Sequence, residues 1–225
     1  MKIFCTILIL FSSIFYGCFT ASYYAEYQIF LAQVERPLNA VQLYGDPIIS
    51  NILLGPKYKF SFEDKLVRIN WYTDSRQILL KLENKTNRTI IIPWDEAAYV
   101  DPDGFSHRVI HISIDYNDKE KPQPPSVIVR NEKLEESILP SDYIKWTNSS
   151  GDASSPNWLV QPFLYDYVTY KPSKEFPSDV LNNFKGAVNL NISKDYQVLL
   201  PLKIDGITYE YIFTFRIEGI KVNTD

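Results

Sequence analysis

The C-terminal segment from Tyr196 to Ile217 constrains the fold most, because apolar and polar residues alternate along it with a period of two. Asp205-Gly206 divides the segment and tolerates the positive φ angles of a tight hairpin turn. The pattern predicts a long β-hairpin with one face in a hydrophobic core. Pro201 cannot donate to a strand ladder, so it predicts an edge or a bulge. The predicted core face comprises Tyr196, Val198, Leu200, Leu202, Ile204, Ile207, Tyr209, Tyr211, Phe213, Phe215 and Ile217.

The same alternation appears at residues 65–72 and 78–83, which are joined by a polar turn. Short strands spaced by roughly 8 to 12 residues, with turn residues between them, are typical of an all-β antiparallel sandwich. The only helix signal covers residues 178–185, with Ser178 as N-cap and Gly186 just past the end. Further strands are predicted at 89–92 and 126–130, and short edge strands at 134–139 and 143–146.

The N-terminus predicts export. Lys2 precedes the apolar run Ile3 to Tyr16, which is shorter than the roughly 20 residues that a membrane-spanning helix needs. We therefore interpret residues 1–18 as a signal peptide. Cys18 follows a glycine, as in a lipoprotein signal, but the residues before it are bulky aromatics. Lipidation of Cys18 and ordinary cleavage nearby are both open interpretations.

Residues 19–57 are interpreted as a tether followed by edge segments, because their apolar residues show no clean period and three prolines interrupt them. The sandwich domain is predicted for residues 58–225. Within it, residues 147–186 are rich in Ser, Asn, Asp and Pro and form a long irregular excursion.

Composition excludes several functions. The only cysteines are Cys5 and Cys18, so the exported domain has no disulfide, thiolate nucleophile or cysteine-based metal site beyond Cys18. The 27 acidic and 23 basic residues are spread along the chain and form no basic stripe, which argues against a nucleic-acid partner. Neither G-x-S-x-G nor a glycine-rich phosphate loop occurs, and no cofactor is predicted.

The stretch from Ile90 to Asp115 holds both histidines, His107 and His111. On a helix their spacing would suit one metal ion. The alternating isoleucines at positions 110, 112 and 114 instead predict a strand, with both histidines on the opposite and exposed face. We therefore predict no metal site.

The carboxylates of this stretch are interpreted as structural. Asp101-Pro102-Asp103-Gly104 predicts a β-turn, because the twelfth position of a calcium loop starting at Asp101 would be Ile112. Asp95 and Glu96 are adjacent and would face opposite sides of a strand, so they do not form an acid-base pair. One of them is expected to pair with Arg108 across the hairpin. The expected structural or binding cluster is Trp94, Asp95, Glu96, Asp101, Arg108 and His111.

Several segments resemble a family of uncharacterised bacterial envelope proteins of the lipoprotein type. They are FEDKLVRINWY at 62–72, LENKT at 82–86, IIPWDEAAYVDPDGFSHRVIH at 91–111, QPPSVI at 123–128 and LPLKIDGITYEYIFTFRI at 200–217. The resemblance implies an immunoglobulin-like β domain. It also favours turn chemistry, rather than glycan attachment, for the N-x-[ST] sequences at Asn84, Asn87, Asn148 and Asn191.

Taken together, these observations predict an exported, non-catalytic binding or assembly module of the cell envelope, lipid-anchored or periplasmic, with an unknown protein or glycan partner. A membrane contact is expected only through the anchor. One alternative is a carbohydrate-binding module, which requires aromatic rings exposed together on one face. The other is a hydrolase that uses His111 with a carboxylate, which requires His111 in a cleft near an acid and a hydroxyl.

Overall fold

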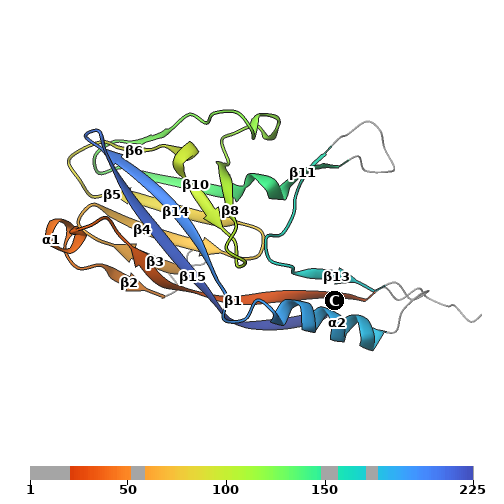
Figure 1. The fold of residues 1–225 in the computed structure, drawn as a ribbon. Helices are drawn as coiled ribbons and strands as arrows, with labels where there is room; N and C mark the ends of the chain where they lie inside the picture. Colours follow the sequence, from red (N-terminus) through yellow and green to blue (C-terminus); the bar gives the residue numbers. More distant parts are fainter. Residues whose placement is uncertain (1–20, 52–58, 148–156, 171–176, 225) are drawn as a thin grey trace, which may run out of the picture.

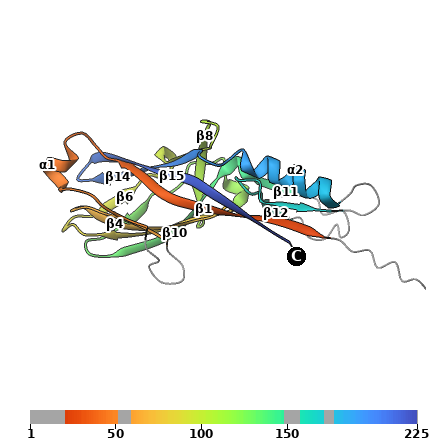
Figure 2. The same ribbon diagram turned by 90° about the horizontal axis from the view of Figure 1, so that it is seen from below.

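The computed structural model describes residues 21–51, 59–147, 157–170 and 177–224. Most of these residues lie in antiparallel strands, which form two layers packed face to face (Figures 1 and 2). The predicted all-β sandwich architecture is therefore confirmed. The predicted signal peptide and Cys18 lie outside the described residues.

The first layer is built on the C-terminal hairpin. Its strands follow the order β13, β1, β15, β14. The other edge of β14 pairs with both β7 and β6, and β9 pairs with β6. The bounds are β13 (Tyr167–Thr169), β1 (Ser22–Glu35), β15 (Ile207–Thr224), β14 (Asp195–Ile204), β7 (Ala98–Val100), β6 (Ile90–Ile92) and β9 (Ser126–Ile128).

The second layer has the order β10 (Lys133–Pro140), β5 (Ile78–Asn84), β4 (Val67–Thr73), β3 (Phe60–Glu63) and β2 (Ile48–Ser50). Strand β8 (Ser106–His111) joins the layers, because its first half pairs with β7 and its second half with β10. The prediction of an edge strand at 134–139 was wrong in position, since β10 lies between β5 and β8.

The C-terminal hairpin was predicted correctly in its turn and in most of its core face. Asp205 and Gly206 have φ angles of 51° and 83°. From Tyr211 to Ile217 the alternate residues are buried, whereas Ile207 is 58% exposed because it lies at the tip of the hairpin. The register of β14 with β15 runs without a shift, so Pro201 does not mark a bulge. It lies where the second partner of β14 changes from β7 to β6, in a gap of that ladder, which is a local edge and suits a residue without an N–H.

Aromatic rings from the two layers meet in the core. Trp71 of β4 packs on Phe213 and Phe215 of β15, with ring centroids 4.8 and 5.6 Å apart. Buried tyrosines of the first layer also reach polar partners in the second: the hydroxyl of Tyr211 donates to Asp64 at 3.0 Å, and that of Tyr196 lies 2.7 Å from the Thr73 hydroxyl. The layers are therefore joined by both apolar burial and satisfied polar groups.

The N-terminal segment differs from the expected tether. Ser22–Glu35 forms the 14-residue strand β1, which pairs with β15 along one edge and with β13 along the other. The helix α1 (Ala40–Tyr44) and the strand β2 follow, and β2 is an edge strand, as expected for part of residues 19–57. Figure 1 shows β13 and the helix α2 beside the end of the β1–β15 ribbon that carries the C-terminus.

The described part of the excursion is more regular than expected. It contributes β12 (Asn157–Val160), which pairs with β11 (Ile144–Thr147), then β13 and α2 (Pro177–Asn189). The predicted helix exists but continues through Gly186, and Ser178 lies inside it. Val180, Phe184 and Val188 are buried at a spacing of four residues, so their burial against the sheet carries the helix past the glycine.

Asn84 illustrates the predicted turn chemistry. Its side chain is buried, its amide nitrogen lies within hydrogen-bond distance of the carbonyl oxygens of Arg88, Ile128 and Val129, and its oxygen accepts from Thr86. A buried amide that holds the turn in this way is not accessible for glycan attachment.

The interlayer core predicts the effect of Trp71→Ala. Truncation of this fully buried ring should lower the free energy of unfolding by about 3–5 kcal/mol, measured by urea denaturation. Phe105→Ala, at a side chain that is 68% exposed, is the control and should change it by less than about 0.5 kcal/mol. A loss below about 1 kcal/mol for Trp71→Ala would contradict the packing of the two layers.

Candidate functional site

The central stretch forms the crossing between the layers. Trp94 begins the 3-10 helix η1 (Trp94–Glu96) and is completely buried. Its indole ring stacks on the ring of His111, with centroids 5.0 Å apart, and its nitrogen donates to the hydroxyl of Ser126 at 2.8 Å. This tryptophan is a core residue and not a surface platform.

His111 is buried, so the expectation that it lies on an exposed strand face was wrong. The reason is that β8 crosses from one layer to the other. Residues 109–111 pair with β10 and are buried, whereas Ile112 lies beyond the strand and is 63% exposed. Nδ1 of His111 lies 3.3 Å from a carboxylate oxygen of the buried Glu136.

The polar side chains around His111 hydrogen-bond to the backbone of the protein itself. The Gln123 side chain accepts from the His111 backbone N–H and donates to the Val109 carbonyl, and Glu136 accepts from the backbone of Ile112. A carboxylate is thus within reach of the imidazole, as a hydrolase would need. The imidazole is only 4% exposed, however, and both of its ring nitrogens are buried without a hydrogen-bond partner among the described residues. A catalytic base must instead be within reach of the substrate.

Asp95 and Arg108 form the expected ion pair across the hairpin, at 2.7 Å. The pair arises differently from the prediction, because Asp95 and Glu96 lie in η1 and not on a strand. Arg108 also donates to the backbone oxygens of Lys119 and Lys121, next to the 3-10 helix η2 (Tyr116–Asp118). Burial opposes ionisation of Asp95, but its hydrogen bonds from Arg108 and Gln123 outweigh burial and lower its pKa. Glu96 is exposed at the end of η1.

Asp101 caps the predicted turn. Its side chain accepts from the backbone N–H groups of Asp103 and Phe105, and Gly104 has a φ of 87°. The second oxygen of Asp101 lies 3.1 Å from Nε2 of His107. The turn and the strand that follows it are therefore fixed to each other.

His107 lies between two carboxylates. Its Nδ1 is 2.9 Å from Asp142, in the 3-10 helix η3 (Ser141–Tyr143), and its Nε2 contacts Asp101. Burial disfavours the imidazolium, but the hydrogen bonds to Asp142 and Asp101 outweigh burial and raise the pKa of His107. Among the described residues, no group of three or more His, Asp or Glu side chains is arranged to hold a metal ion.

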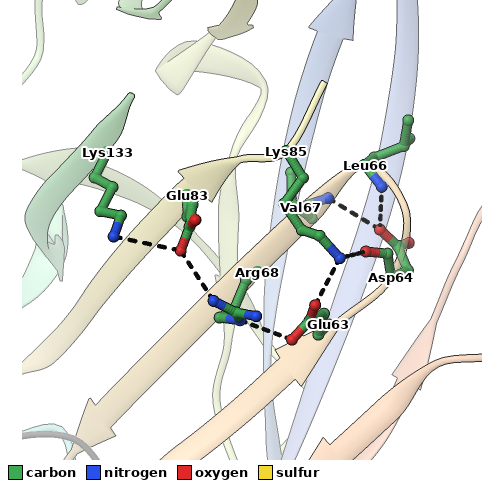
Figure 3. A network of polar contacts seen from close by, with 8 residues as sticks. All are labelled: Glu63, Asp64, Leu66, Val67, Arg68, Glu83, Lys85 and Lys133. Carbon is green, nitrogen blue, oxygen red and sulfur yellow. Dashed lines mark hydrogen bonds and ion pairs between the residues drawn. The ribbon is translucent and has the colours of Figure 1, made fainter. Parts of the chain in front are cut away.

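A row of alternating charges crosses the outer face of the second layer (Figure 3). Directly opposed positions on four strands carry Lys133, Glu83, Arg68 and Glu63. Arg68 contacts Glu63 at 2.7 Å and Glu83 at 3.2 Å, and Lys85 contacts Glu63 at 2.6 Å. Each charge has an opposite neighbour, so the row fixes strand register and offers no unpaired charge to a ligand.

An open candidate site lies elsewhere, in a cleft of about 390 Å³ that we name the Arg76 cleft. It is formed by Arg76, in the turn between β4 and β5, and by residues 159–162 and 165–167 of the excursion. Tyr165 and Tyr167 are 46% and 45% exposed. The ring of Tyr165 also packs edge-on against Phe184, with centroids 5.4 Å apart, and the Tyr167 hydroxyl donates to the Ser22 hydroxyl at 3.0 Å. The lining residues are Arg76, Leu159, Val160, Gln161, Pro162, Tyr165, Asp166 and Tyr167.

Arg76 is held in one orientation. Its Nε and Nη2 donate to the two carboxylate oxygens of Asp166 at 2.7 and 2.9 Å, and the Ser75 hydroxyl donates to the same carboxylate at 2.6 Å. Asp166 is buried, whereas half of the Arg76 side chain is exposed. Such a two-point pair fixes the guanidinium plane at the wall of the cleft.

No local sequence pattern predicts this cleft. Arg76 stands in a polar turn and Asp166 in the excursion, 90 positions apart, and neither belongs to a motif. The only sequence signal is the pair of tyrosines flanking Asp166. None of the candidate site residues predicted from the sequence lines the cleft.

Comparisons with family models, curated proteins and solved structures find no match to this chain. Within the part of the chain that the structure describes, no helix has the length and apolar character needed to cross a membrane.

His107→Gln tests the bridge between Asp101 and Asp142. Because the pKa of His107 is raised in the folded state, its stabilisation is fully present below its usual pKa and is lost as pH rises through the folded-state value. The free energy of unfolding should therefore differ more between the natural protein and His107→Gln at pH 5.5 than at pH 9. Urea denaturation at both values measures this. Asn87→Gln, at an exposed turn residue, should show no such change. A difference independent of pH would refute the charged bridge.

Proposed function

We propose that this chain is a non-catalytic binding module exported to the bacterial cell envelope, and that it holds its ligand in the Arg76 cleft. The observation that carries the proposal is the contrast between the two candidate sites. Trp94, Arg108 and both histidines of the central stretch are engaged in internal contacts. The cleft instead presents half-exposed tyrosines and a fixed guanidinium to solvent. Its volume lies within the roughly 300–1,000 Å³ typical of small-ligand sites.

The absence of a catalytic role is part of the proposal. A general acid or base must reach the substrate. His111 is buried under Trp94, and His107 holds two carboxylates with its two ring nitrogens. In the cleft, Asp166 accepts three hydrogen bonds from neighbouring side chains, which favours a positioning role over proton transfer.

The envelope location rests on the sequence. The apolar run Ile3 to Tyr16 supports export, and the resemblance to envelope proteins with an immunoglobulin-like domain supports a lipid anchor at Cys18. With a lipid at Cys18, the domain would remain at a membrane surface and bind its partner there.

Binding is tested with an envelope fraction of the host bacterium. The mature chain should co-sediment with the fraction, and Gln161→Ala with Tyr167→Ala should weaken co-sedimentation about tenfold. The matched control is Phe105→Ala, which removes an exposed aromatic residue outside the cleft lining. Absence of binding, or binding that the cleft variants leave unchanged, would refute the proposed function.

The anchor is tested separately by Cys18→Ser. If Cys18 is lipidated, this variant should move from the membrane fraction to the soluble exported fraction, measured by fractionation and immunoblotting. An unchanged distribution would rule out the anchor while leaving the binding site in the cleft untouched.

A further inference from the structure

The residues that line the Arg76 cleft differ in chemistry. They include the half-exposed tyrosines Tyr165 and Tyr167 together with Leu159. They also include the polar residues Arg76, Asp166 and Gln161. The face of an aromatic ring attracts weakly positive C–H groups, while guanidinium and amide groups donate hydrogen bonds to oxygen atoms. A ligand that matches both has C–H faces and many hydroxyl oxygens.

The charge of the lining argues against an anionic ligand. Arg76 and Asp166 are the charged lining residues, and they neutralise each other through a two-point pair. This pair occupies Nε and one N–H of Nη2, and among the described residues Nη1 has no hydrogen-bond partner. The cleft therefore offers an oriented donor without a net positive charge. A phosphate or carboxylate would gain little attraction there.

The backbone along the cleft is partly paired. The N–H groups of Gln161 and Phe163 donate to the carbonyls of Tyr143 and Ser75, and the Asp166 carbonyl accepts from the Ala25 N–H. Among the described residues, β12 and β13 each pair along one edge only. An extended peptide, which binds by pairing with free backbone groups, is therefore the competing ligand that the test must separate from a sugar.

We infer that the Arg76 cleft binds a neutral carbohydrate chain, an inference that rests on the proposed binding function. The sugar ring lies against Tyr165 or Tyr167, and its hydroxyl groups accept from Arg76 and exchange hydrogen bonds with Gln161. Asp166 acts as a positioning residue, because both of its oxygens are bonded to Arg76 and one also to Ser75.

The test is isothermal titration calorimetry of the mature chain with three kinds of probe. Neutral hexasaccharides of glucose, xylose and N-acetylglucosamine represent the inferred class, hexagalacturonate represents acidic glycans, and an unstructured decapeptide represents peptides. At least one neutral hexasaccharide should bind. Gln161→Ala and Tyr167→Ala should each weaken this binding about tenfold, whereas Phe105→Ala should leave it unchanged.

The variants separate binding from folding. Arg76→Lys keeps the charge but cannot form the two-point pair, so it should also weaken binding. Gln161→Ala leaves the Arg76–Asp166 pair intact, so a loss of affinity in that variant with an unchanged urea midpoint locates the sugar in the cleft.

Three outcomes overturn the inference. If the decapeptide or hexagalacturonate binds through the cleft and the neutral sugars do not, the ligand class is wrong while the proposed binding function stands. If a neutral sugar binds but the cleft variants have no effect, the site is wrong. If neither the probes nor the envelope fraction bind, the binding function itself fails.

Discussion

The sandwich depends on one constraint, which is that β8 pairs with β7 along its first half and with β10 along its second. One short strand belongs to the first layer at Arg108 and to the second layer at Ile110. The ring of Trp94 fills the space beside the crossing by stacking on His111, and Gln123 and Glu136 bond the backbone there. Because a buried polar group without a partner is costly, the hydrogen bonds of Gln123 and Glu136 stabilise the crossing. Because Gln123 and Glu136 make these bonds, their side chains are not available to act on a substrate.

The excursion completes the structure and forms the cleft. The part of the excursion from Phe163 to Asp166 is tied to both layers. The Phe163 N–H donates to the Ser75 carbonyl of the second layer, and the Asp166 carbonyl accepts from the Ala25 N–H of the first. Asp166 then holds Arg76 with its side chain. A segment fixed by its backbone can present its side chains with little entropic cost on binding, which suits a preformed site.

The strands with local alternation could be predicted from the sequence. β4, β5 and the C-terminal hairpin show buried residues at every second position, and this period needs no knowledge of partners. β1 was missed although Tyr23, Ala25 and Tyr27 are buried alternately, because Tyr24 and Phe30 on its other face blur the pattern. The burial of His111 could not be predicted, since it follows from a crossing that only the pairing of distant strands defines. The cleft depends on Arg76 and Asp166 meeting, for which no local pattern exists.

We propose that the ligand binds in the Arg76 cleft and not in the central stretch. The most direct measurement is a ¹H–¹⁵N correlation spectrum of the mature chain, titrated with a neutral oligosaccharide digest of the host's envelope polysaccharide. We expect shifts concentrated at residues 76, 159–161 and 165–167, including the Arg76 Nε–H resonance. Shifts centred on residues 94–111, or no shifts at saturating digest, would contradict this proposal.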